Sequence, residues 1–335
     1  MQQRLGIVGC GAVVELSHLP ALQKLRVKVS ALIDPSPERR RSVARLLGTD
    51  LVEAANMEEA VEAFDIAIVA APHMFHEPIC RALLAAGKSV LVEKPIAVTA
   101  QSCAAINETA RQNGARIAVG LMRRQSKASI WLKDALVAGA FGKLDRFVIR
   151  EGYEFGWPVT TDSLWRREKS GGGVLMDTGA HTMDQVVWWF GEPDNIEYFD
   201  DSDGGVEADC LIRMRWKNGL QGEVELSRTR RLSNAATLFS ERGRLSLATL
   251  GNDITGDKAM LRYSSPRVGK PVFRAQSVLN LFTEQFGAFL AYTGGAVANV
   301  VTGEEGARSV SLIERCYATR QRLELPWLLY TGEAA

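Results

Sequence analysis

Asp177 and His181 lie four residues apart in the stretch GGGVLMDTGAHTMDQVVWWFG, residues 171–191, of a chain that has only four histidines. Residues i and i+4 share one face of a helix, so the two side chains are expected to point the same way. An imidazole with an ordinary pKa of about 6.5 suits acid/base chemistry at neutral pH. The carboxylate would orient the imidazole or accept a substrate hydroxyl. The alternative, favoured for the pair alone, is that the two side chains only satisfy each other.

Lys94 is a second candidate, in the tetrapeptide VEKP at residues 92–95. It follows an apolar strand pattern, and ligands of open α/β sheets bind beyond the carboxyl ends of the strands. Pro95 biases Lys94 toward an extended backbone. A protonated Lys94 could stabilise negative charge that develops on a ligand oxygen. His181 is thus the candidate acid/base and Lys94 would assist it; an ordinary surface lysine is the alternative.

A cofactor motif is expected near the N-terminus, in GIVGCGAVVELSH. Gly9 and Gly11 stand where a strand turns into a helix, with Ala12 and Val13 opening that helix. Glycines allow the tight turn and the close approach of a dinucleotide pyrophosphate to the helix N-terminus. Val14 occupies the place of the third glycine of the fingerprint, so a merely tight turn is the alternative.

Asp34 ends the second predicted strand, close to the spacing at which an acidic residue meets the adenosine ribose. A carboxylate there would repel a 2′-phosphate, so NAD is expected rather than NADP. The arginines at 39–41 keep NADP possible, and the segment DPSP also reads as a turn and helix cap.

The secondary-structure pattern that must position these residues differs between the first and the second part of the chain. Up to about residue 123, apolar strands alternate with helices, which predicts a doubly wound parallel sheet of the Rossmann type over residues 1–123. Helices are expected over about 12–24, after the cap Ser36–Pro37, and over 58–64. The remainder, 124–335, predicts an α+β domain with a mainly antiparallel sheet, and its last helix, about 303–322, is expected to pack back on the first domain. Asn218-Gly219 predicts a tight hairpin turn.

Composition limits the classes of function. A length of 335 residues favours two domains, and a net charge of +1, from 40 basic and 39 acidic residues, gives no reason to expect a nucleic-acid partner. No apolar run is long enough for a membrane span. Five scattered cysteines predict reduced thiols in a cytoplasmic protein, and neither they nor the histidines have the spacing of metal ligands.

Taken together and in this order, GIVGCGAV, DPSPER, AAPHMFHEP, VLVEKP and GGGVLMDTGAHTMDQVVWWFG resemble the Gfo/Idh/MocA oxidoreductases, named for glucose–fructose oxidoreductase and inositol dehydrogenase. The resemblance spans nearly the whole chain. It implies hydride transfer between NAD(P) and a secondary alcohol of a sugar, nucleotide-sugar or cyclitol. It also implies a homodimer or homotetramer formed through the C-terminal sheet.

Carried over by residue, the resemblance makes Lys94 the lysine of the Glu-Lys-Pro motif and Asp177 and His181 the paired residues of the substrate-domain helix. It places Ala71, Pro72, His73 and Glu93 along the nicotinamide half of the cofactor. The family often has an aromatic residue and then a proline where this chain has QSKAS, residues 125–129, so the resemblance does not identify the substrate.

Further candidates are weaker. His73 and His76 could line the cofactor crevice, although capping or packing is the simpler interpretation. Trp165, Arg166, Tyr153 and Arg124 are expected to contact substrate; packing or solvation is the alternative. Two other classes of function stay open: an NAD-dependent glycoside hydrolase that uses transient oxidation, and a catalytically silent NAD-binding regulator.

Overall fold

The first domain is built on a parallel sheet. The computed structural model describes residues 3–48, 51–159 and 162–324. Six strands follow the order β3-β2-β1-β4-β5-β6, and every neighbouring pair is parallel. The strands are β1 (Leu5–Val8), β2 (Val29–Ile33), β3 (Val52–Ala54), β4 (Ile66–Val69), β5 (Ser89–Val92) and β6 (Ile117–Val119). This is the predicted doubly wound arrangement, and the fold class is confirmed.

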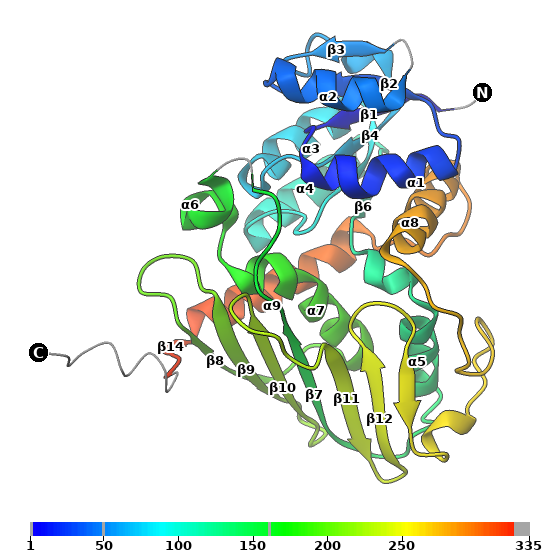
Figure 1. Cartoon of the computed structure of the whole chain (residues 1–335), viewed down its shortest axis with the longest axis vertical. Coiled ribbons are helices and arrows are strands. Elements are labelled where there is room, and N and C mark those ends of the chain that lie inside the picture. Colours follow the sequence, from blue (N-terminus) through cyan, green and yellow to red (C-terminus); the bar gives the residue numbers. More distant parts are fainter. Residues whose placement is uncertain (1–2, 49–50, 160–161, 325–335) are drawn as a thin grey trace, which may run out of the picture.

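Helices cover both faces of this sheet, in blue and cyan in Figure 1. They are the π-helix η1 (Val14–His18), α1 (Leu19–Lys24), α2 (Pro37–Leu47), the 3₁₀ turns η2 (Val61–Ala63) and η3 (His73–Phe75), α3 (His76–Ala85) and α4 (Ala100–Gln112). The central strands β1 and β4 are buried along their whole length, which explains their continuous apolar sequences. Separate apolar clusters pack on the two faces.

The second domain is built on a larger mixed sheet, in green and yellow in Figure 1. Its eight strands follow the order β13-β12-β11-β7-β10-β9-β8-β14, and only the pairs β7–β10 and β8–β14 are parallel. The strands are β7 (Leu144–Gly152), β8 (Asn195–Asp200), β9 (Asp209–Arg215), β10 (Gln221–Ser227), β11 (Ala235–Ser240), β12 (Gly243–Ala248), β13 (Ile254–Gly256) and β14 (Arg320–Arg322).

One face of this sheet packs on helices. Residues alternate along β10, where Val224 and Leu226 are buried while Glu223 and Glu225 lie on the opposite face. The apolar face meets α7 (Val174–Phe190), which is buried along most of its length and packs beside α5 (Lys127–Val137). The short elements η4 (Met122–Gln125), η5 (Asp162–Trp165), α6 (Arg167–Ser170) and η6 (Met260–Arg262) complete the connections.

The last two helices join the domains. Helix α8 (Val278–Thr293) packs against α1, and α9 (Gly303–Ala318) packs against both α4 and α7. Gly303 and Gly306 allow α9 to approach the first sheet closely, since a Cβ at Gly306 would lie 2.6 Å from the Val119 side chain. These helices therefore fix the first domain against α7, which carries Asp177 and His181.

Several local predictions are confirmed. The Ser36 hydroxyl caps α2 by accepting the Arg39 N–H at 3.3 Å, with Pro37 at the first helical position. Gly219, at a φ of +90°, forms the turn between β9 and β10.

Three predicted helices differ from the structure. Residues 58–64 form only a short 3₁₀ turn, because Asn56 bonds the Glu59 carboxylate at 2.6 Å and Phe64 is extended, with its ring against Gly6. The first helix spans 12–24 as predicted, but its turn Val14–His18 is the π-helix η1, which places His18 Nε2 2.7 Å from a Glu93 oxygen. The last helix ends at Ala318, and the strand β14 follows because it pairs with β8.

Candidate active site

The loop after β1 has the backbone geometry of a dinucleotide-binding turn. Gly9 has a φ of +91°, and a Cβ there would lie 2.6 Å from the Ala70 carbonyl oxygen. Gly11 faces open space, since the only atom near its missing Cβ is an Arg39 nitrogen at 3.8 Å. Glycine is therefore needed at the first position by packing, and at the second it leaves room for a ligand.

Asp34 connects this loop to the next strand. Its Oδ2 accepts the Cys10 N–H and its Oδ1 accepts the Ser36 N–H, both at 2.8 Å. A carboxylate has about four acceptor positions, so it retains capacity for ribose hydroxyls. Val14, at the place of the third glycine, is fully buried in the core under β1.

A cavity of about 890 Å³ lies over this loop. Its lining includes Gly9, Gly11, Ala12, Val13 and Asp34 from the first two strand ends, and Ala71, Pro72 and His73 from the loop after β4. Its size, the open face of Gly11 and the acidic group in its lining fit a dinucleotide. Eight of the eleven residues predicted to bind the cofactor thus line this cavity, whereas His76, Glu93 and Lys94 line the cavity beside it.

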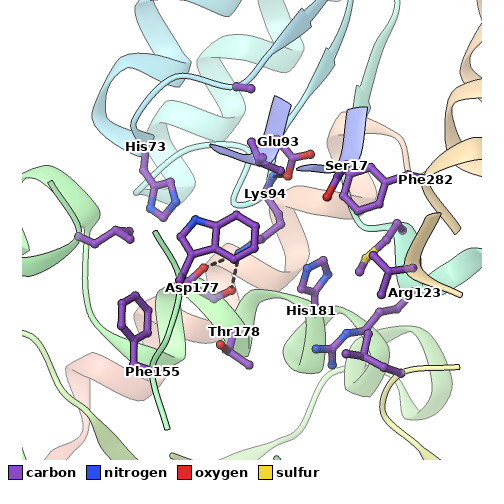
Figure 2. Close-up of a pocket in the computed structure, with 18 of the residues that line it drawn as sticks. Ser17, His73, Glu93, Lys94, Arg123, Phe155, Asp177, Thr178, His181 and Phe282 are labelled. Carbon is purple, nitrogen blue, oxygen red and sulfur yellow. Dashed lines mark hydrogen bonds and ion pairs between the residues drawn. The ribbon is translucent and has the colours of Figure 1, made fainter. Parts of the chain in front are cut away.

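A second cavity, of about 520 Å³, adjoins the first. Six residues line both, namely Val13, Ala70, Ala71, His73, Trp157 and Leu164. Lys94, Asp177 and His181 lie together in the second cavity, with His76, Glu93 and Tyr153 (Figure 2). The nicotinamide end of a dinucleotide in the first cavity would thus meet the predicted catalytic residues.

Asp177 lies between two cations. Lys94 Nζ donates to its Oδ1 at 2.5 Å and to its backbone carbonyl at 3.1 Å, and Arg228 donates to Oδ2 at 2.7 Å. Burial acts to raise the pKa of Asp177, but the charges of Lys94 and Arg228 outweigh it and hold that pKa well below the ordinary value. Asp177 is therefore an ionised carboxylate that fixes the Lys94 ammonium.

His181 follows one turn later and is 8% exposed. Its buried Nδ1 has no hydrogen-bond partner in the described part of the chain, and Asp177 does not bond it. Burial lowers the pKa of His181 well below the ordinary value, and the charges of Arg123 and Lys94 act in the same direction. The imidazole is thus neutral, and the interpretation in which Asp177 and His181 only satisfy each other does not describe this helix.

Other groups complete the cavity wall. The hydroxyls of Tyr153 and Thr178 lie 3.2 Å apart, and Figure 2 shows Thr178 on the same helix as Asp177 and His181. Arg123 is 4% exposed and forms a double hydrogen bond with the buried Glu151, at 2.8 and 2.5 Å. It contributes positive potential to the cavity, while its own charge is compensated.

The histidines beside the cofactor end are neutral as well. Burial lowers the pKa of His73 to about 4, assisted by the charges of His76 and Lys94. Its Nδ1 lies 3.0 Å from the Ser170 carbonyl oxygen, a contact between the two domains. His76 bonds the Ala71 and Pro95 carbonyl oxygens at 2.8 Å, and so holds the loop after β4 against the loop that carries Lys94. Both histidines have structural contacts and also line the second cavity.

Three predicted substrate residues do not line either cavity. The Arg124 guanidinium is buried in ion pairs with Asp184 and Glu305, the closest at 2.6 and 2.8 Å. Arg166 pairs with Asp162 at 2.5 Å on the surface, and Trp165 is 49% exposed with its ring against Phe155. Arg124 lies in η4 and Trp165 in η5, while Arg166 is the N-cap residue of α6.

Two other residues of the site were not predicted. Arg123 lines the second cavity although only its neighbour was predicted, because sequence spacing does not tell which arginine of a 3₁₀ turn points inward. Arg228, in the segment SRTRR, belongs to no motif, and only the placement of the end of β10 brings it to Asp177. Within the described residues no group of three or more histidine, cysteine or acidic side chains could hold a metal ion. No described helix is long and apolar enough to cross a membrane.

Curated relatives match part of this arrangement. Inositol 2-dehydrogenase/D-chiro-inositol 3-dehydrogenase of Shouchella clausii is 33% identical over 194 residues, which are 56% of this chain and 53% of that protein. Rhizopine catabolism protein MocA of Rhizobium meliloti is 30% identical over 194 residues, 58% of this chain and 59% of that protein. The match thus spans about half the length of these relatives.

A solved structure matches over nearly the whole chain. The WlbA dehydrogenase from Bordetella pertussis, in complex with NADH and UDP-GlcNAcA, has a TM-score of 0.78 with 18% identity, covering 95% of this chain and 96% of that one. At this identity the likeness concerns the fold.

Two family descriptions match the chain in succession. Residues 3–121 match the oxidoreductase family with an NAD-binding Rossmann fold, GFO_IDH_MocA, and residues 130–246 match the GFO/IDH/MocA C-terminal domain. The first match covers the loop of Gly9 and Gly11, Asp34 and Lys94, and the second covers α7. The chain therefore belongs to the Gfo/Idh/MocA oxidoreductase family, with an NAD-binding Rossmann fold as its N-terminal domain.

Proposed function

We propose that this protein is an NAD(P)-dependent dehydrogenase that transfers a hydride between a nicotinamide cofactor and a secondary alcohol of a sugar, nucleotide-sugar or cyclitol. The inositol dehydrogenase relative and the fold neighbour in complex with UDP-GlcNAcA support this range of substrates. The observation that carries the proposal is a neutral His181, whose buried Nδ1 has no hydrogen-bond partner among the described residues, in the same cavity as the charged Lys94 and next to the cavity that fits a dinucleotide.

The roles of the residues follow from their charge states. His181 is neutral, so a ring nitrogen accepts the hydroxyl proton of the alcohol. Lys94 has three N–H groups, of which Asp177 takes two, and the third donates to the carbinol oxygen as it gains negative charge. When bound, the nicotinamide supplies the hydride acceptor. Thr178 and Tyr153 orient a second hydroxyl of the substrate.

We propose NAD as the preferred cofactor, because the Asp34 carboxylate at the ribose end repels a 2′-phosphate. Arg39 lines the same cavity, so NADP binding is a direct comparison to make. All five cysteines are buried free thiols, which supports a reducing, cytoplasmic setting.

We also propose a homodimer or homotetramer that forms through the open face of the second sheet. The charged side chains of this face pair across strands, as in Arg150–Glu225 at 3.1 Å and Arg213–Glu223 at 3.7 Å. Light scattering of the purified protein measures the assembly, and a monomer at micromolar concentration would contradict this part.

The test is a panel of inositols, aldoses and nucleotide-sugars with NAD and with NADP, followed by the absorbance of the reduced cofactor. We expect reduction with at least one member and a preference for NAD. Sugar release without net reduction would identify a glycoside hydrolase instead. Tight NADH binding with neither reaction would identify a regulator.

A further inference from the structure

Arg228 is a buried cation at the boundary of the substrate cavity. It follows β10 directly and is 5% exposed, and its backbone N–H donates to the Ala208 carbonyl at 2.8 Å. Its guanidinium bonds Asp177 Oδ2 at 2.7 Å and lies 5.1 Å from the centre of the Phe155 ring, a residue that lines the cavity. Arg228 itself lines neither cavity.

The two carboxylate oxygens of Asp177 bond different partners. Lys94 takes Oδ1, and Arg228 takes Oδ2. With both oxygens engaged from opposite sides, the carboxylate cannot turn to hold Lys94 with both oxygens. Lys94 therefore keeps one N–H free toward the cavity.

The charges lead to the same result. Lys94 and Asp177 alone sum to zero, and a neutral pair would stabilise an alkoxide weakly. With Arg228 the three side chains carry one net positive charge instead of none; beside them, Arg123 pairs with Glu151, and Glu93 is hydrogen-bonded to His18. The remaining titratable groups beside the triad, His73 and His181, are neutral.

We propose that Arg228 is a positioning residue, which engages the second oxygen of Asp177 so that Lys94 presents a free N–H to the carbinol oxygen. This inference rests on the proposed function. Arg228 acts through Asp177 and does not touch the substrate.

The experiment compares Arg228→Met and Arg228→Lys with Arg230→Met. The control removes an arginine two residues further on, which pairs with Asp209 and Glu225 and not with Asp177. With the substrate found in the panel, we expect Arg228→Met to lower kcat on the order of 10- to 100-fold, because a charged hydrogen bond is lost. KM and the affinity for NADH should stay within about twofold of the wild-type values. Arg228→Lys should recover most of kcat, because it keeps the charge.

A double variant tests the route of the effect. In the background of Asp177→Asn, Arg228→Met should cost less than about threefold in kcat, because the partner through which Arg228 acts is already gone. An equal loss of kcat in the wild-type and the Asp177→Asn background would overturn the proposal.

A second readout needs neither cofactor nor substrate. The rate of reductive methylation of Lys94, followed by mass spectrometry, should fall about threefold in Arg228→Met, because Asp177 then holds Lys94 with both oxygens. A merely structural arginine would loosen the site on removal and raise that rate, which would overturn the proposal. If the wild type oxidises no alcohol, the proposed function fails, and the methylation rate still decides the role of Arg228. Should Arg228→Met not fold, Arg228→Gln replaces it.

Discussion

The cofactor cavity and the substrate cavity are built in different ways. Around the first, Cys10 and Ser36 belong to two consecutive strand ends of the first domain, and their backbone N–H groups donate to Asp34. Around the second, Lys94, Asp177 and Arg228 come from three distant segments and are joined by charged side chains. The cofactor-binding turn therefore forms from contacts within the first domain. The charged group that performs chemistry forms only when both domains are assembled.

The difference has an energetic consequence. A backbone loop that loses one hydrogen bond can rearrange at modest cost, but a buried ion loses its compensation when its partner is removed. Substitutions around the substrate cavity are therefore expected to abolish chemistry, and those around the cofactor cavity to weaken binding.

The largest effect is expected at the two residues assigned to the reacting oxygen. His181→Gln removes the base and should lower kcat by about 10²- to 10⁴-fold, and Lys94→Met should lower it by about 10²- to 10³-fold. NADH affinity, measured by fluorescence titration, should stay within about threefold for His181→Gln. Near-normal turnover of both folded variants would break the distinction between the two cavities.

Asp34→Ala is the corresponding test of the cofactor cavity. It removes the acceptor for the ribose and for the Cys10 and Ser36 N–H groups, so NAD affinity should fall about 10- to 100-fold, as after the loss of one or two charged hydrogen bonds. At saturating NAD, kcat should recover to within about threefold. A kcat that stays low would show that the cofactor turn also controls chemistry. The affinity for NADP should fall less than that for NAD, because the repelling carboxylate is gone.

Gly9→Ala and Gly11→Ala form a matched pair on the local turn. Alanine at position 9 meets the Ala70 backbone at 2.6 Å with a positive φ, so the free energy of unfolding in urea should fall by about 3 kcal/mol. Alanine at position 11 meets no close atom, so stability should change by less than about 1 kcal/mol while NAD affinity falls. Equal destabilisation by both would contradict the assignment of Gly11 to the ligand.

The smallest effect concerns pH. The pKa of His73 is lowered to about 4, chiefly by burial, so the unfolded chain binds a proton between pH 6.5 and 4 that the folded chain does not. Stability should therefore decrease as pH falls through this window, by at most about 1.4 kcal/mol per pH unit for this residue and by less because its ring is partly exposed. In His73→Gln, urea unfolding between pH 7 and 5 should show a shallower decrease. An unchanged slope would mean that the folded chain binds this proton as readily as the unfolded chain does.

The same difference between the two cavities decides how much of the structure could be predicted from the sequence. The parallel sheet, the turn at Gly9, the position of Asp34 and the end of β5 at Lys94 could be predicted, because each depends on residues near one another in the chain. The helix of Asp177 and His181 could be predicted too. The residue that bonds the second carboxylate oxygen of Asp177 could not, because Arg228 follows a strand end and belongs to no motif.

The neighbours Arg123 and Arg124 show the limit most directly. One lines the substrate cavity while the other is buried against Asp184, and the difference is one residue in a 3₁₀ turn. The failed helix at 58–64 has a similar cause, because the packing of Phe64 under Gly6 decides its conformation. Contacts between distant segments set both outcomes, and no local pattern contains them.

The central claim is that the two cavities are the halves of one hydride-transfer site. It is tested most directly with an alcohol from the panel that carries deuterium on the carbinol carbon, by mass spectrometry of the reduced cofactor. We expect one deuterium in the reduced cofactor formed by the wild type, and almost no reduced cofactor formed by Lys94→Met or His181→Gln. Reduced cofactor without deuterium, or no reduction by a wild type that binds NADH, would contradict it.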